Sequence, residues 1–278
     1  MTKTYVITGA TSGIGEALLN KLMCENNVIF AGYRTDAGRN KLENLSSQNI
    51  CPFYVDYDKP ETIKEASDFI KKRCTKIDTL INVAGCVVAG PVENIEIDEI
   101  RHQFNVNVFG HIELTQNLIP FLGAGKIINI SSMASYGLFP FITPYCASKR
   151  CLDMFFNSLL IENKQNIKVI SIKPGVIATP LWEKSIQENS KYFEKFGNYS
   201  EEMEYVLANA KRNETRGLTA EKVANMILKI DGMKNPKLSY TIGFDAFLAK
   251  LVSHFPQTVI NNIIKFGIKV KIFKSKKH

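Results

Sequence analysis

A glycine-rich turn between an expected strand and an expected helix is the feature that most constrains how this chain can fold. Residues 4–8 form a short β-branched run, glycines stand at positions 9, 13 and 15, and a helical pattern begins at Glu16. Glycine lets the backbone turn sharply and lets a ligand or a helix approach closely. The free N–H groups and positive dipole end of the helix suit a pyrophosphate. The turn therefore predicts a phosphate-binding site, unless its glycines only close a tight turn.

A second pattern lies in the middle of the chain, where a hydroxyl, a phenol and an ammonium come within reach of one another. Residues 126–130 predict a buried strand, so the Ser132 hydroxyl would lie at its carboxyl end, where ligands of open α/β sheets bind. A helix from Thr143 would place Tyr145 and Lys149 one turn apart on one face. A free tyrosine titrates near pH ~10, and a neighbouring cation stabilises its phenolate. The pattern predicts that Lys149 lowers the pKa of Tyr145, although Tyr-x-x-x-Lys alone is common on helix surfaces.

These two patterns together resemble the short-chain dehydrogenase/reductase family, over roughly the first two thirds of the chain. The glycine turn matches the family's Thr-Gly-x-x-x-Gly-x-Gly, and residues 82–85 are similar to its Asn-Asn-Ala-Gly, with Val83 as a departure. The resemblance implies an α/β fold, a doubly wound parallel sheet (Rossmann-like) in a single domain. It also implies reversible hydride transfer between a nicotinamide cofactor and a carbonyl or secondary alcohol.

The same resemblance assigns catalytic roles to four residues. In the reductive direction Tyr145 would donate a proton to the carbonyl oxygen, and Ser132 would hydrogen-bond that oxygen. Lys149 would also hold the nicotinamide ribose. Asn107, within a helix expected over residues 97–121, matches an asparagine that holds a water in the family's proton relay, although it could instead stand at a local kink beside Gly110.

Cofactor selection is expected at the end of the second strand, residues 28–32. The family selects NAD with an acid at the position of Tyr33, and this acid is absent here. A guanidinium binds phosphate well, so Arg34, with Ser12 and Arg39 nearby, predicts NADP. Asp36 keeps NAD open as an alternative. The predicted cofactor contacts are Gly9, Ser12, Gly13, Ile14, Gly15, Arg34, Asp56, Asn82, Ala84, Gly85, Tyr145, Lys149, Pro174, Gly175, Ile177 and Thr179.

Residues 181–216 are the expected substrate lid, because the family builds its lid after the sixth strand. The segment has mixed charge and carries Trp182, Tyr192, Phe193, Phe196, Tyr199 and Tyr205. As a set these aromatic residues favour an apolar substrate, although each could equally close a core. The nearest branch of the family, with 17β-hydroxysteroid dehydrogenases, retinol dehydrogenases and acyl-dihydroxyacetone-phosphate reductases, also implies a lipophilic substrate.

The carboxyl-terminal extension, residues 244–278, carries much of the formal net charge of +8. Such an excess can indicate an anionic partner, but here it belongs to a tail and not to a fold-wide basic face, so we expect no nucleic-acid partner. Two apolar stripes with lysines near the end predict an amphipathic extension able to lie on an anionic membrane. We expect the protein to be a homo-oligomer, and the extension could equally cover the substrate entrance or a neighbouring subunit.

Composition and the remaining residue patterns narrow the class of protein. A hydrophobic content of 45% with 22% charged residues is typical of a globular protein. The cysteines lack CxxC spacing, and we find neither a secretion signal nor an uninterrupted bilayer-spanning run, so a cytoplasmic location is expected. The four histidines show no ligand spacing, which predicts no metal. A non-catalytic NADP-binding sensor and a membrane-recruited scaffold remain as alternatives to an enzyme.

Overall fold

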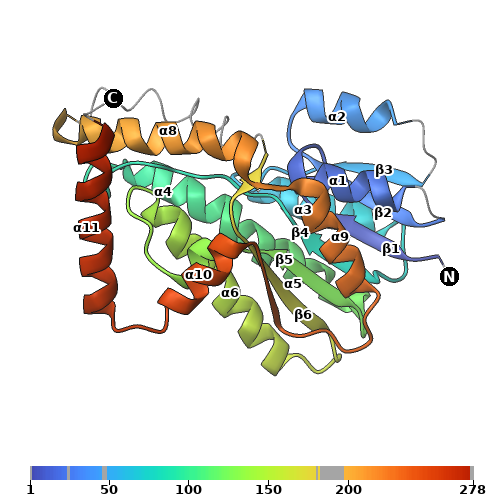
Figure 1. Ribbon diagram of the computed structural model, residues 1–278. Coiled ribbons are helices and arrows are strands. Elements are labelled where there is room, and N and C mark those ends of the chain that lie inside the picture. Colours follow the sequence, from blue (N-terminus) through green and yellow to red (C-terminus); the bar gives the residue numbers. More distant parts are fainter. Residues whose placement is uncertain (1, 24–25, 46–48, 180, 182–196, 276–278) are drawn as a thin grey trace.

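Seven parallel strands form the central sheet of the computed structural model, which describes residues 2–23, 26–45, 49–179, 181 and 197–275 (Figure 1). The strand order is β3-β2-β1-β4-β5-β6-β9. The direction of winding reverses between β1 and β4, and open sheets of this kind bind ligands beyond the carboxyl ends of the strands at that point. The strands are β1 (Thr4–Ile7), β2 (Val28–Tyr33), β3 (Ile50–Tyr54), β4 (Thr79–Asn82), β5 (Lys126–Ile130), β6 (Lys168–Pro174) and β9 (Ser239–Ile242).

Helices cover both faces of the sheet, and two further short strands, β7 (Ile177–Ala178) and β8 (Leu218–Thr219), pair beside it (Figure 1). The helices are α1 (Gly13–Leu22), α2 (Asp36–Glu43), α3 (Pro60–Lys71), α4 (Ile97–Phe104), α5 (Gly110–Leu122), α6 (Thr143–Glu162), α8 (Ser200–Arg216), α9 (Ala220–Asp231), α10 (Phe244–Val252) and α11 (Gln257–Ser275). A π-helical turn, η1 (Asn105–Phe109), joins α4 to α5, and a 3-10 turn, η2 (Met133–Tyr136), follows β5.

The alternation of side chains along each strand builds two cores, one on each face of the sheet. In β1, Tyr5 and Ile7 belong to the core under α1 and α9, while Val6 belongs to the opposite core under α3, α5 and α6. Because both faces are covered, the strands read as apolar runs, as parallel strands usually do. The same alternation in β5 sets the directions of Ser131 and Ser132, which follow at its carboxyl end.

The predicted doubly wound sheet is confirmed, and the predicted strands lie within two residues of those observed. The expected helix over 97–121 is instead two helices separated by η1. Such π-helical turns often occur at functional sites. The expected lid is described at Leu181 and from residue 197, so Trp182, Tyr192, Phe193 and Phe196 lie outside the described residues. Among the described helices, none is both long enough and apolar enough to cross a bilayer.

Candidate active site

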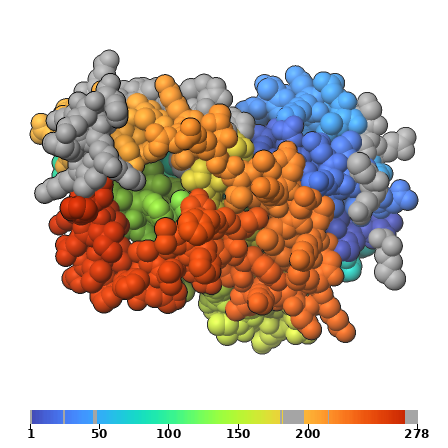
Figure 2. Space-filling model, viewed as in Figure 1, coloured from blue at the N-terminus to red at the C-terminus, as the bar shows by residue number. Residues whose placement is uncertain are grey.

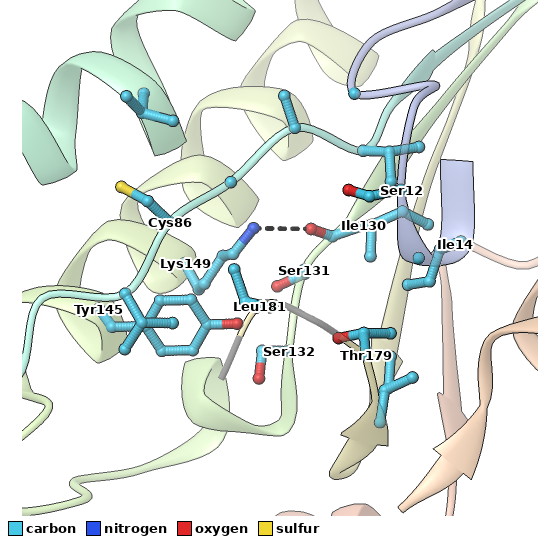
Figure 3. A pocket seen from close by; sticks show the side chains of 18 of the residues that line it. Ser12, Ile14, Cys86, Ile130, Ser131, Ser132, Tyr145, Lys149, Thr179 and Leu181 are labelled. Carbon is cyan, nitrogen blue, oxygen red and sulfur yellow. Dashed lines mark hydrogen bonds between the residues drawn. The ribbon is translucent and has the colours of Figure 1, made fainter. Parts of the chain in front are cut away.

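A cavity of about 280 Å³ runs along the carboxyl ends of the central strands. Ser12 and Ile14 of the glycine turn after β1 lie at one end, and Ser132, Tyr145 and Lys149 lie at the other (Figure 3). Arg34, after the neighbouring strand β2, also lines the cavity. The loop after β4 and the segment from Pro174 to Thr179 line it between these ends. The two patterns that the sequence analysis took from distant parts of the chain therefore face one cavity.

The glycine turn depends on the absence of side chains at two positions. Gly9 has a φ of 63°, and a Cβ atom there would stand 3.0 Å from the Cα of Ala84. A Cβ atom on Gly15 would stand 2.2 Å from the carbonyl oxygen of Gly9, which holds the start of α1 against the turn. Ser12 is the N-cap residue of α1 and makes no side-chain capping bond, although its side chain lines the cavity. The helix start therefore presents uncapped N–H groups towards the cavity, as an anion site requires.

The polar cluster at the other end comes from two elements. Ser132 follows β5 and caps η2, where its Oγ accepts a hydrogen bond from the Ala134 N–H at 3.1 Å. Tyr145 and Lys149 stand one turn apart on α6, and both are buried. The Lys149 Nζ donates to the Ile130 carbonyl at 2.9 Å and lies 5.8 Å from the centre of the Tyr145 ring. Figure 3 shows the Tyr145 hydroxyl pointing into the cavity beside Ser132, with Lys149 on its other side.

Burial controls the proton affinities of this cluster. It raises the pKa of Tyr145 to about 12, with a hydrogen bond to Ser132 opposing the shift. It lowers the pKa of Lys149 to about 8, with Asp153 opposing that shift. The expectation that Lys149 lowers the tyrosine's pKa is therefore wrong for this structure, where desolvation of the phenolate is the largest influence on that pKa. At neutral pH Tyr145 holds its proton, and Lys149 is charged.

Asn107 lies in η1, directly behind the cluster, and is fully buried. Its Oδ1 accepts from the Cys86 N–H at 2.9 Å, and its Nδ2 donates to the Cys86 carbonyl at 3.1 Å and to Ser148 Oγ at 3.0 Å. These bonds fix the loop after β4 against α6. The structure therefore gives Asn107 a positioning role, and also places it in the kink that the sequence analysis kept as an alternative. Its water-relay role stays a prediction.

Comparisons with known proteins agree with this geometry. Residues 3–190 match the family described as short chain dehydrogenase. The chain belongs to the short chain dehydrogenase family. It is 28% identical over 275 residues to the NADPH-dependent 3-dehydrocapnine reductase of Ornithobacterium rhinotracheale, covering 95% of this chain and 96% of that protein.

One further relative supports the assignment to the short chain dehydrogenases, and one solved structure agrees with the fold. The chain is 32% identical over 197 residues to the NADPH-dependent 1-acyldihydroxyacetone phosphate reductase of Saccharomyces cerevisiae, covering 68% of this chain and 66% of that protein. A short-chain dehydrogenase structure from Streptomyces avermitilis superposes with a TM-score of 0.75 at 24% identity, covering 98% of this chain and 97% of the other. The last likeness shows the fold alone.

Most of the cofactor contacts predicted for this short chain dehydrogenase line the cavity. They are Gly9, Ser12, Gly13, Ile14, Arg34, Ala84, Gly85, Tyr145, Lys149, Pro174, Gly175, Ile177 and Thr179. Gly15, Asp56 and Asn82 are not among the lining residues. Gly15 packs against Gly9, Asn82 donates to Asn129 Oδ1 at 2.8 Å, and Asp56 Oδ1 accepts from the Asp58 N–H at 3.2 Å. These three residues have structural contacts here, and their cofactor roles stay predictions.

The sequence analysis missed the apolar wall of the reaction end. Val87, Phe139, Ile142 and Leu181 line the cavity around Tyr145, together with Cys86. Phe139 and Ile142 stand in the loop between η2 and α6, so their position between Ser132 and Tyr145 in the sequence was an available signal. Val87 follows the Ala84-Gly85 turn, with Cys86 between them. The wall makes the space beside the Tyr145 hydroxyl largely apolar.

Proposed function

We propose that this short chain dehydrogenase uses NADP(H) to interconvert a carbonyl and a secondary alcohol on a lipophilic substrate. The observation that carries the proposal is one cavity with a glycine turn at one end and Ser132, Tyr145 and Lys149 at the other. NADPH would supply the hydride. The names of two relatives specify NADPH, and one of them acts on an acylated substrate.

The residues present fit a phosphorylated dinucleotide. The uncapped start of α1 and the close approach of Gly9 to Ala84 leave backbone on two sides of the cavity, as a pyrophosphate needs. Arg34 is exposed at the end of β2 and lines the same end, so its guanidinium is available for a 2′-phosphate. Arg39 is placed differently, because its Nε pairs with Glu43 Oε1 at 2.8 Å on the surface of α2.

The reaction end supplies a proton and holds an oxygen. Tyr145 is protonated at neutral pH, so in the reductive direction its hydroxyl can give a proton to the oxygen of a bound carbonyl. Ser132 lies beside that hydroxyl and can donate a hydrogen bond to the same oxygen. The Lys149 ammonium stabilises the phenolate that forms as the proton leaves. Asn107 keeps the Cys86 loop in place behind this cluster.

The apolar wall supports the substrate class. Val87, Phe139, Ile142 and Leu181 would exclude water and bind a hydrocarbon group beside the reacting carbonyl. We also propose that residues 181–216 act as the lid over this end. Tyr199, just before α8, packs edge to face on Phe141 with ring centres 6.4 Å apart, and its hydroxyl donates to Glu93 Oε1 at 2.8 Å. These contacts attach the described part of the lid to the loops before α4 and α6.

The test is the loss of NADPH absorbance with a panel of carbonyl compounds. We expect turnover with acyl-dihydroxyacetone phosphate, long-chain 3-keto lipids, steroid ketones or retinaldehyde, and little with small sugars. NADPH should be preferred to NADH. Absence of turnover with every compound, together with intact NADPH binding, would favour a non-catalytic sensor. A clear preference for NADH would overturn the cofactor assignment.

A further inference from the structure

The two helices at the carboxyl end carry an unusual amount of exposed apolar surface. On α10 the exposed positions 244, 247, 248 and 251 repeat at helical spacing, and on α11 positions 259, 263 and 266 do so. Phe244 is 83% exposed and Phe266 is 70% exposed. We call this set the C-terminal face. It consists of Phe244, Phe247, Leu248, Leu251, Phe255, Val259, Ile263 and Phe266.

The side chains of the C-terminal face lie on the outer side of helices that already pack against the protein. Ala246 on α10 and Ile260 on α11 are buried, so each helix already turns one side towards the protein. In Figure 2 the segment from α10 to α11 forms a continuous strip in red along one edge of the molecule. Soluble monomers rarely expose contiguous apolar patches this rich in large side chains, and such patches usually mark a binding surface.

The charge around this face indicates what it binds. Residues 246–278 contain no aspartate or glutamate and seven lysines, so this segment carries +7 of the formal +8 of the whole chain. Lys250 and Lys265 are exposed on the two helices themselves. The remainder, residues 1–245, is close to neutral, with 28 basic and 27 acidic residues. Apolar stripes and cationic side chains thus coincide on one segment.

We propose that the C-terminal face docks on the surface of an anionic lipid bilayer. An amphipathic basic helix lies in the plane of the interface, with its apolar side chains among the acyl chains and its lysines at anionic headgroups. Each basic residue near such a surface strengthens binding by about fivefold. A second copy of this chain is a poorer occupant, because pairing two such faces would bring +7 against +7.

The C-terminal face adjoins the reaction end of the cavity. Asp245, in the first turn of α10, accepts a hydrogen bond from the Val176 N–H at 2.7 Å. The same carboxylate closely approaches Gly175, and Gly175 and Val176 both line the cavity. α10 also packs against η2, which begins directly after Ser132, so a bilayer under α10 would lie beside the end of the cavity that has the apolar wall. A lipid-dissolved substrate could reach that end from the bilayer, a consequence that rests on the proposed function, whereas the docking itself does not.

Vesicle co-sedimentation of the full chain tests the docking. The probes are phosphatidylcholine vesicles and vesicles with about one third phosphatidylserine. We expect binding to the anionic vesicles, at least tenfold weaker binding to the neutral ones, and loss of binding at high salt. The double variant Phe247→Asp/Leu251→Asp should weaken binding to anionic vesicles by at least tenfold, and Lys250→Gln/Lys265→Gln should also weaken it.

The matched control places the same charges on another exposed apolar surface. Met154 and Ile161 on α6 are 67% and 84% exposed, so Met154→Asp/Ile161→Asp should leave vesicle binding unchanged. Circular dichroism and NADPH binding would show that each variant is folded. Wild-type chain that stays in the supernatant with anionic vesicles would overturn the proposal, as would equal weakening by the α6 control. A dimer that Phe247→Asp/Leu251→Asp converts to monomer, without any vesicle binding, would instead identify the face as a subunit contact.

Discussion

Tyr145 and Lys149 show at the scale of single residues what a sequence can and cannot predict. Their spacing and the position of Ser132 at a strand end follow from helix and strand geometry, so the cluster was predictable. The proton affinities were not, because they depend on how completely both side chains are desolvated. Burial raises the pKa of the phenol and lowers that of the ammonium. The apolar wall at Phe139 and Ile142 was not predicted either, because loop residues show no periodicity.

Removing the phenolic hydroxyl tests the role of Tyr145 directly. Tyr145→Phe should lower kcat for carbonyl reduction by about 10²–10⁴-fold, because the proton donor is lost while the ring is kept. NADPH binding, followed by fluorescence, should change little. Tyr240→Phe is a suitable control, since the Tyr240 hydroxyl accepts from the Lys237 N–H and does not line the cavity. Equal activity of Tyr145→Phe and wild type would contradict the proposed chemistry.

Lys149 should set the alkaline limit of the reductase reaction. Its pKa is about 8, lowered by burial, so the side chain is an ammonium below that pH and neutral above it. A developing phenolate at Tyr145 is stabilised only by the charged form, so kcat for reduction should fall as pH rises through about 8. Steady-state rates at saturating NADPH across this range would show the decline. If kcat for reduction stayed constant well above this pH, the ammonium would take no part in the proton transfer.

Arg34 should decide the choice of cofactor. Its guanidinium lines the cavity end near the glycine turn, whereas Arg39 pairs with Glu43 on α2. A hydrogen bond to a charged group contributes about 1.5–3 kcal/mol, so Arg34→Ala should raise KM for NADPH about 10–100-fold with little effect on NADH. Arg39→Ala is the matched control and should retain the NADPH preference. If Arg39→Ala raised KM for NADPH more than Arg34→Ala, the 2′-phosphate site would lie at α2 instead.

At the scale of elements, the glycine turn and α1 form one unit whose contacts are too close for any side chain. Gly15→Ala would place a methyl group 2.2 Å from the Gly9 carbonyl oxygen, which must shift the start of α1. Overpacking of this kind costs about 1–3 kcal/mol of unfolding free energy, and NADPH binding should weaken as well. Gly137→Ala is the control, because a Cβ atom there would meet nothing within 4 Å. Urea unfolding and NADPH titration of both variants would measure the difference.

The elements differ in how well their sequences predicted them. Strands and long amphipathic helices were predictable because each buries a periodic apolar face. The π-helical turn η1 and the β7–β8 pair were not, since both depend on contacts between distant segments. Asn107 is an example, because its bonds to Cys86 bridge 21 positions of sequence. The helix over 97–121 was therefore predicted as continuous, although its ends were nearly correct.

At the scale of the whole molecule, the start of the chain and the end of α9 meet on the amino-terminal side of the sheet. Asp231, at the end of α9, accepts hydrogen bonds from Lys3 at 2.6 Å, Tyr5 at 2.9 Å and Thr79 at 2.5 Å. Burial acts to raise the pKa of this carboxyl, yet these donors hold it below its usual range. These hydrogen bonds hold β1, β4 and α9 together at the edge of the sheet opposite the active site. The carboxyl edge is thus left free for ligands.

His111 should make the folded state sensitive to mild acid. It is buried beside the active site, where its Nε2 donates to the Ala84 carbonyl at 2.8 Å and Tyr57 lies against its ring. Burial lowers its pKa to about 3, so the folded state keeps it neutral, whereas the unfolded chain binds a proton near pH ~6.5. The unfolded state therefore binds more protons between these values, and stability falls as pH drops below ~6.5, by about 1.4 kcal/mol per pH unit.

Replacement of the imidazole separates this effect from general acid unfolding. His111→Gln keeps a side-chain N–H for the Ala84 carbonyl and removes the titration, so its stability should change about 2 kcal/mol less than that of wild type between pH ~6.5 and ~5. Asp231 contributes a loss only at lower pH, because a carboxyl with a depressed pKa gives up its stabilisation as pH falls below its unfolded value near ~3.9. Urea unfolding at the two pH values, with the exposed His254→Gln as control, would measure the slopes. Identical slopes for His111→Gln and wild type would show that His111 can take up a proton without leaving the fold.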